Sequence, residues 1–126
     1  MVFVKKKHER IEHVWMKAFL WAFYLDTYPE ASVEIDIPGR YKPDVVMMGR
    51  CPGEPVFWGE AGHVGADKLA HLLNHHPNTH FAFAKWDTSL APHIALWQEA
   101  LRTARQGPID LWSFPEDSPT RFVDDD

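Results

Sequence analysis

The sequence has little of several features that assign a protein to a class at once. It contains a single cysteine, Cys51, among 126 residues, which excludes an internal disulfide framework and favours a reducing compartment. It contains no apolar run that approaches the roughly eighteen residues of a membrane span. Its first residues, Met1–Lys7, lack the long apolar segment of a signal peptide. We therefore expect a cytoplasmic protein with no membrane partner.

The chain also lacks a positive net charge. Its formal net charge of −5 at pH 7 argues against strong nonspecific nucleic-acid binding by bulk charge. The charge is uneven, because Lys5–Lys7 form a basic patch and Asp124–Asp126 form an acidic run. The lysines could contact phosphates or simply be solvated. The net charge therefore weakens the hypothesis of a nucleic-acid partner but does not exclude it.

What the sequence does contain indicates one globular domain over residues 1–126. Hydrophobic residues make up 45% of the chain, with six Trp and eight Phe to fill a core. Hydrophobic periodicity and Gly/Pro punctuation predict alternating elements. The expected helices are about Lys6–Tyr24, Gly65–Pro77 and Pro92–Arg105, and the expected strands are Val33–Ile37, Lys42–Met48, Val56–Ala61, His80–Ala84 and Ile109–Phe114. Residues 115–126 are expected to form a loosely held acidic tail.

This order, helix, three strands, helix, strand, helix and strand, predicts an α+β fold. Short turns join the first three strands, so these strands should pair antiparallel. The later strands alternate with helices, which favours crossover connections and parallel pairing. The expected architecture is a mixed β-sheet flanked by helices.

Two acidic residues stand at the ends of one predicted hairpin. If the loop closes symmetrically about Pro52, Asp44 lies directly opposite Glu60 on the adjacent strand. Opposite residues of an antiparallel pair have Cβ atoms roughly 5 Å apart, and like charges there repel. A hairpin selected only for stability would avoid this pair, whereas a site for a divalent cation would require it.

The order of elements, with Pro43-Asp44 on one strand and Glu60-Ala61-Gly62 ending the next, resembles the PD-(D/E)XK nuclease superfamily. Its shared core is the restriction-endonuclease-like fold. Within that superfamily the chain resembles the YaeQ type of small bacterial proteins. The likeness runs from Glu12 to about Trp86 and includes a helix with Lys68 after the Glu60 strand.

The resemblance implies a role for each of four residues. Asp44 and Glu60 would bind Mg²⁺ or Mn²⁺, and Glu12 on the first helix would complete the metal site. The superfamily's lysine normally stands two residues after the second acid, where this chain has Gly62. In some members a lysine of the following helix substitutes for it, and Lys68 matches that alternative.

The chemistry of phosphodiester hydrolysis agrees with these roles. The reaction needs an activated water and stabilisation of negative charge, which a carboxylate-bound divalent cation supplies. A lysine can orient the water or stabilise the charge. The sequence therefore predicts a metal-dependent nuclease acting on DNA or RNA. Because the usual lysine is missing, the alternative is a catalytically degenerate member that binds nucleic acid or a protein partner.

Plainer interpretations stay open for each residue. Asp44 could make a local turn hydrogen bond after Pro43, and Glu60 could be a structural carboxylate paired with Lys68. Lys68 and Glu12 could be solvated helix residues. A weaker alternative is a zinc site, because His71 and His75 have the i, i+4 spacing of two ligands on one helix face.

Overall fold

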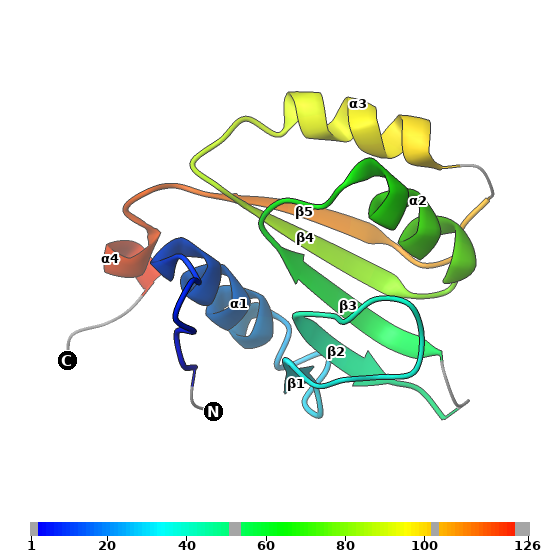
Figure 1. Ribbon diagram of the computed structural model, residues 1–126, viewed down its shortest axis with the longest axis horizontal. Helices are drawn as coiled ribbons and strands as arrows, with labels where there is room; N and C mark the ends of the chain where they lie inside the picture. The colour runs from blue at the N-terminus through cyan, green and yellow to red at the C-terminus, as the bar shows by residue number, and fades with distance from the viewer. Residues whose placement is uncertain (1–2, 51–53, 102–103, 123–126) are drawn as a thin grey trace.

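The computed structural model describes residues 3–50, 54–101 and 104–122. Helices and strands alternate along most of this chain (Figure 1). In chain order they are α1 (Ile11–Phe23), β1 (Ser32–Val33), β2 (Val45–Met48), β3 (Pro55–Ala61), α2 (Ala66–His75), β4 (His80–Trp86), α3 (Ala91–Ala100), β5 (Ile109–Phe114) and α4 (Ser118–Phe122). None of the helices in the described part of the chain is long and apolar enough to span a membrane.

The strands form one open mixed sheet in the order β1-β2-β3-β4-β5. The β1–β2 and β2–β3 pairs are antiparallel, and the β3–β4 and β4–β5 pairs are parallel. The parallel pairs are connected through α2 and α3, since a parallel return needs a crossover. The expected mixed sheet with flanking helices is confirmed.

Helices cover both faces of the sheet (Figure 1). Alternation along β3 and β4 divides their side chains between two clusters, as the two-residue period of a strand requires. One cluster joins α1 to the sheet through Phe19, Leu20, Phe57 and Ala82. The other cluster joins α2 and α3 to the opposite face. Its largest buried members are Trp58, Leu69, Leu72, Leu73, Phe81, Phe83 and Trp97.

The chain between α3 and β5 is tied to the end of α2. Arg105 donates to the carbonyl oxygens of Leu73, His76 and Thr79 at 2.6, 3.0 and 2.5 Å. These bonds satisfy carbonyl groups that a helix C-terminus leaves without partners. Gly107 lies so close to the Thr79 backbone that a Cβ there would stand 2.2 Å from the Thr79 oxygen. This approach requires glycine.

The observed elements differ from the predicted ones at several ends. The predicted strand Val33–Ile37 is wrong beyond Val33, because Glu34 has a left-handed φ of 55° that interrupts an extended backbone. Helix α1 begins at Ile11 rather than near Lys6. Helix α3 ends at Ala100, so its predicted extension to Arg105 is also wrong.

The C-terminal segment contains an element that the sequence did not predict. Helix α4 lies within the part expected to be a loose tail. Its first turn is supported by Ser118, whose hydroxyl donates to the Pro115 oxygen at 2.6 Å. The acidic run Asp124–Asp126 lies outside the described residues, as does the hairpin apex with Cys51 and Pro52.

Candidate functional site

The β2–β3 hairpin sets the backbones of the two predicted acidic residues opposite each other. The register pairs Val45 with Gly59 and Val46 with Trp58. Continued by one residue, this register sets Asp44 opposite Glu60, and the Asp44 N–H donates to the Gly59 oxygen at 3.2 Å. The pairing of Val45 to Met47 is the one that symmetric closure about Pro52 predicts, but the register shifts by one residue between Met47 and Met48, so the closure is not symmetric next to the loop.

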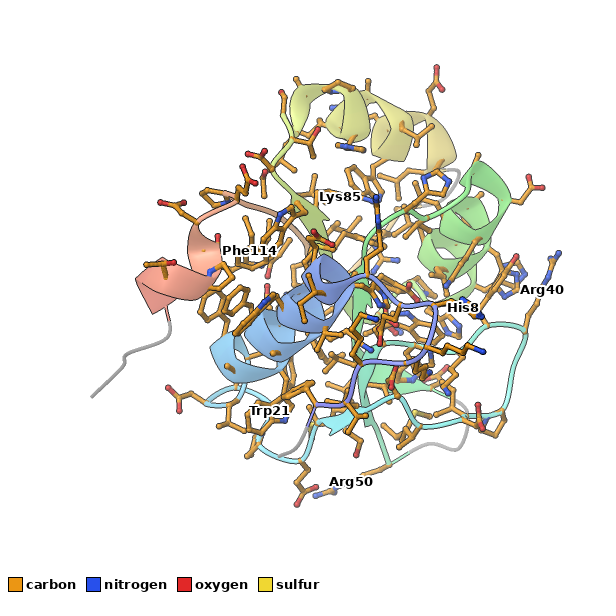
Figure 2. The ribbon with its side chains drawn as sticks, turned by 60° about the vertical axis from the view of Figure 1, so that its left-hand side comes forward. His8, Trp21, Arg40, Arg50, Lys85 and Phe114 are labelled. Carbon is orange, nitrogen blue, oxygen red and sulfur yellow. The ribbon has the colours of Figure 1, made fainter. Side chains whose placement is uncertain are left out.

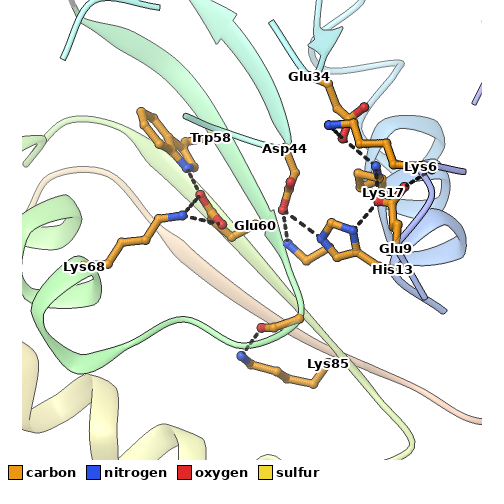
Figure 3. A network of polar contacts seen from close by, with 12 residues as sticks. Lys6, Glu9, His13, Lys17, Glu34, Asp44, Trp58, Glu60, Lys68 and Lys85 are labelled. Atoms are coloured by element: carbon orange, nitrogen blue, oxygen red, sulfur yellow. Dashed lines mark hydrogen bonds and ion pairs between the residues drawn. The ribbon is translucent and has the colours of Figure 1, made fainter. Parts of the chain in front are cut away.

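Glu60 is buried, with 4% of its surface exposed. Its Oε1 accepts a hydrogen bond from Trp58 Nε1 at 2.8 Å, and Lys68 Nζ lies 3.1 Å from both carboxylate oxygens (Figure 3). Burial and the negative charge of Asp44 raise the pKa of Glu60 to about 7, against the lowering effect of Lys68 and Trp58. Glu60 is therefore a carboxylate whose negative charge is opposed by its surroundings.

Asp44 lies closer to the surface, at the start of β2. Its Oδ2 accepts a hydrogen bond from the Ala61 N–H at 2.8 Å and lies 3.6 Å from His13 Nε2. The Asp44 carboxylate raises the pKa of His13 to about 9, with a further contribution from Glu9 and against the effect of burial. His13 is consequently a cation at neutral pH, placed beside one of the two candidate ligands.

An ion-pair network continues from His13 along α1 to the N-terminal segment (Figure 3). Glu9 Oε2 lies 2.5 Å from both His13 Nδ1 and Lys17 Nζ. Lys17 Nζ also lies 2.7 Å from Glu34 Oε1, which is 3.2 Å from Lys6 Nζ. The cationic groups next to Asp44 are thus held in place by further carboxylates.

Lys85 is a buried lysine close to Glu60 that sequence reasoning missed. In the parallel β3–β4 pair, Ala84 is the partner of Ala61. Lys85, the next residue of β4, therefore lies beside Gly62. Its ammonium donates to the Gly62 carbonyl oxygen. Burial lowers the pKa of Lys85, and the charge of Glu60 partly offsets that effect. Gly62 itself has a φ of 85°, which disfavours any side chain at the superfamily's usual lysine position.

Two adjoining hollows open at this end of the sheet. One has a volume of about 600 Å³ and includes Asp44 in its lining, and the other, of about 470 Å³, is lined partly by Gly62. His8, Glu9 and His13 line both, so together they form one cleft. Its remaining basic side chains are Lys6, Lys7, Arg10, Lys42 and His63. Most of the charged groups around Asp44 in this cleft are therefore basic.

The structure brings three of the four predicted residues together. Asp44, Glu60 and Lys68 gather at the same end of the β2–β3 hairpin. Glu12 is half-exposed on the first turn of α1, and in the described part of the chain no hydrogen bond or ion pair joins it to those three. Its role as a third ligand stays a prediction.

The donor set meets the minimum for a divalent cation. Among the residues that the structure describes, no group of three or more His, Cys, Asp and Glu side chains could hold a metal ion. Mg²⁺ needs fewer protein ligands, because it keeps several waters and is often bound through one or two carboxylates plus substrate phosphate. Asp44 and Glu60 would supply two such carboxylates only if Lys68 and His13 give up their contacts and both side chains turn to one ion. A zinc site with three such ligands around His71 and His75 is not supported within the described residues.

Comparison with known proteins extends only to the fold. No family model matches the chain, and no curated protein matches its sequence. The crystal structure of the YaeQ protein from Pseudomonas syringae is similar, with a TM-score of 0.65 and 14% sequence identity. The match covers 96% of this chain and 63% of the YaeQ chain, so this chain spans less than two thirds of its neighbour's length. The chain therefore has a fold similar to that of YaeQ.

Proposed function

We propose that the protein is a metal-dependent phosphodiesterase of the PD-(D/E)XK type, acting on DNA or RNA, with the restriction-endonuclease-like fold of that superfamily. The opposition of Asp44 and Glu60 on adjacent strands is the observation that carries the proposal. Like charges placed opposite each other cost stability in an antiparallel pair. A cation bound between them would remove that cost, so the arrangement is what a divalent-cation site requires.

Each residue of the site has a task in this reaction. Asp44 and Glu60 would hold Mg²⁺ or Mn²⁺, which activates water and stabilises negative charge on the phosphate. Lys68, already 3.1 Å from Glu60, would turn to the attacking water or to the developing charge when the carboxylate engages the cation. Lys85 would keep a second ammonium at the Gly62 carbonyl, next to the reacting group.

The cleft supports the same substrate class. Phosphodiesters bind where several cations line a path, because neutralising phosphates releases counterions. Lys6, Lys7, Arg10 and Lys42 line the cleft around Asp44, although the whole chain has a net charge of −5. The basic groups are therefore concentrated where a phosphate backbone would lie.

One observation favours a second candidate, a degenerate member of this fold that binds nucleic acid or a protein partner without cleaving it. Lys68 contacts both oxygens of Glu60, so the buried carboxylate already has a cation of its own. An ion pair of this kind stabilises the metal-free state and competes with a metal. The two candidates predict different responses to Mn²⁺: a stabilising shift for the nuclease and no shift for the degenerate member.

The test compares thermal melts of the original protein with the Asp44→Asn variant in EDTA and in Mn²⁺. A ligand at a hundred times its dissociation constant stabilises a protein by about 2.7 kcal/mol, a melting shift on the order of 10 °C for a domain of this size. Asp44→Asn should lose most of that shift, and its stability in EDTA should change little, because the weakened contact with His13 and the relieved repulsion of Glu60 oppose each other. Asp36→Asn is the matched control, because Asp36 is 92% exposed.

Cleavage of single- and double-stranded DNA and RNA with Mg²⁺ or Mn²⁺ completes the test. Activity that disappears in Asp44→Asn and Glu60→Gln and survives in Asp36→Asn supports the nuclease. Binding of nucleic acid or a protein partner without a Mn²⁺ shift or turnover supports the degenerate member instead. Destabilisation of Asp44→Asn in EDTA, together with a full Mn²⁺ shift, would show that Asp44 is a structural residue.

A further inference from the structure

A third hollow, separate from the cleft, is lined by Trp58, whose indole N–H donates to Glu60. It has a volume of about 310 Å³ and lies between the segment before β2, strand β3 and helix α2. Most of the side chains that line it are planar or cationic: Arg40, Tyr41, Trp58, His71, His75 and His76. We name it the ring pocket. Its lining contains no carboxylate, which distinguishes it from the cleft at Asp44.

The rings of this pocket are arranged as stacking partners. The imidazoles of His71 and His75 lie parallel, with centroids 4.1 Å apart and an interplanar angle of 16°. Tyr41 meets the His71 ring edge to face at 5.2 Å. Trp58 is only 2% exposed and stacks on His76 at 5.8 Å. Trp58 therefore forms the floor, and the half-exposed Tyr41 and His71 present ring surface to the opening.

The charges of the pocket suit an aromatic ligand that carries a phosphate. Burial lowers the pKa of His71, with the positive charges of His75 and Arg40 adding to the effect, which favours the neutral ring. Burial likewise lowers the pKa of His76. Arg40, which extends from the edge of the molecule, has its guanidinium 5.2 Å from the Tyr41 ring (Figure 2). The pocket thus combines two imidazoles whose neutral form is favoured, His71 and His76, with a permanent cation at its rim.

Two residues connect the ring pocket directly to the candidate site. Trp58, its floor, donates its indole N–H to Glu60. Lys68 has its ammonium 3.1 Å from Glu60 and 5.5 Å from the centre of the Tyr41 ring. A group in the ring pocket therefore lies next to Trp58 and Tyr41, which lead through the indole N–H and the Lys68 ammonium to Glu60.

We propose that the ring pocket receives an unpaired nucleobase of a single-stranded nucleic acid whose phosphodiester lies at Asp44 and Glu60. The inference rests on the proposed function and gives its substrate class. Bases in a duplex cover one another's faces, whereas an unpaired base can stack on protein rings. The rings of Tyr41 and His71 provide such a platform, and Arg40 can reach the adjoining phosphate.

The test measures binding in EDTA, so that cleavage does not enter. The probes are fluorescein-labelled oligothymidylate and oligouridylate of about ten nucleotides, the corresponding duplexes, and a strand of the same length without bases. Anisotropy should give tighter binding of the single strands than of either the duplexes or the abasic strand. Since stacking of one base is worth about tenfold in affinity, Tyr41→Leu should weaken single-strand binding roughly tenfold, and Tyr41→Phe should restore it.

Arg40→Gln and Arg50→Gln form a matched pair, because each removes one exposed arginine and the two lie at different edges of the molecule (Figure 2). Only Arg40→Gln should weaken binding of the single strands. Melting curves of all variants in EDTA verify that each is folded.

The outcomes separate this inference from the function on which it rests. If Tyr41→Leu binds single strands as well as the original protein does, or if the abasic strand binds equally well, the ring pocket takes no base. Metal-dependent cleavage that persists in that case leaves the nuclease intact and overturns only the subsite. If no strand binds and Mn²⁺ neither stabilises the protein nor supports cleavage, the nuclease and the subsite are both wrong.

Discussion

Replacing Lys17 by methionine isolates the energetics of the network beside Asp44. Lys17 is 1% exposed, and its ammonium lies 2.5 Å from Glu9 and 2.7 Å from Glu34. Methionine has a similar length and no charge, so it fills the space without compensating either carboxylate. The substitution therefore leaves two carboxylates without their shared buried cation and changes little in the packing around α1.

Removing one partner of a buried ion pair costs about 3 to 5 kcal/mol, because the remaining charge stays buried. The lower end of that range applies here, since Glu9 keeps His13 as a partner and Glu34 keeps Lys6. Glu34 is also 24% exposed, so water compensates part of its charge. We expect a loss of about 3 kcal/mol at pH 7, which lowers the melting temperature by about 10 °C in a domain of this size.

The loss should depend on pH in a defined direction. Burial raises the pKa of Glu9, but the hydrogen bonds from Lys17 and His13 together lower it by more. The pKa of Glu9 in the folded protein is therefore about 2, against an ordinary value of 4.5. A carboxylate with a lowered folded pKa contributes stability above its unfolded pKa, and that contribution is lost as pH falls through the folded value. Without Lys17 most of this contribution is absent, so the difference between variant and original protein should shrink from pH 5 toward pH 2.

Thermal melts at several pH values between about 7 and 3 check this expectation. Lys7→Met is the matched control, because Lys7 is exposed and the same atoms are exchanged. The control should melt within a degree or two of the original protein at every pH. The reasoning is refuted if Lys17→Met is as stable as the control at pH 7, or if its deficit is the same at pH 3 as at pH 7.

Two further substitutions test the packing around the end of α2. Gly107→Ala should lower the free energy of unfolding in urea by at least about 2 kcal/mol, because the new Cβ would stand 2.2 Å from a backbone oxygen. Gly65→Ala is the control: a Cβ at Gly65 meets open space, so the loss should be less than about 1 kcal/mol. Thr79→Val should cost about 1 to 3 kcal/mol, because the buried Pro55 oxygen loses a 2.6 Å hydrogen bond. Equal melting temperatures for the two glycine variants, or an unchanged one for Thr79→Val, would contradict these contacts.

The hairpin and its opposed acids could be predicted because they depend on local information. Register in a two-stranded pair follows from the position of the turn, and every residue from Asp44 to Glu60 belongs to that one unit. The glycines and prolines between the strands mark the turn, but they do not reveal the register shift between Met47 and Met48. The neighbouring helix with Lys68 begins only a few residues later, so its approach to Glu60 is also nearly local.

The remaining parts of the site depend on how distant segments pack. Lys85 reaches Gly62 only because β4 pairs parallel with β3 in one particular register, which no local pattern specifies. His13 meets Asp44 through the docking angle of α1 on the sheet, and helical periodicity alone cannot rank it above Glu12. The one available signal was Glu9, His13 and Lys17 at four-residue spacing on one helix face, which favours ion pairs.

The strands lie in the sheet in the same order as in the chain, which affects how the sheet forms while the protein is being translated. Each strand pairs with its predecessor, so during synthesis the newest strand always forms an edge that is not yet paired on one side. The edge of β4 is the most hazardous, because five consecutive residues of this strand are buried in the finished protein and its last partner begins only at Ile109. A chain halted between Trp86 and Ile109 presents an open apolar edge, the usual starting point for pairing between molecules. Aggregation of nascent chains should therefore peak for chains released in that interval.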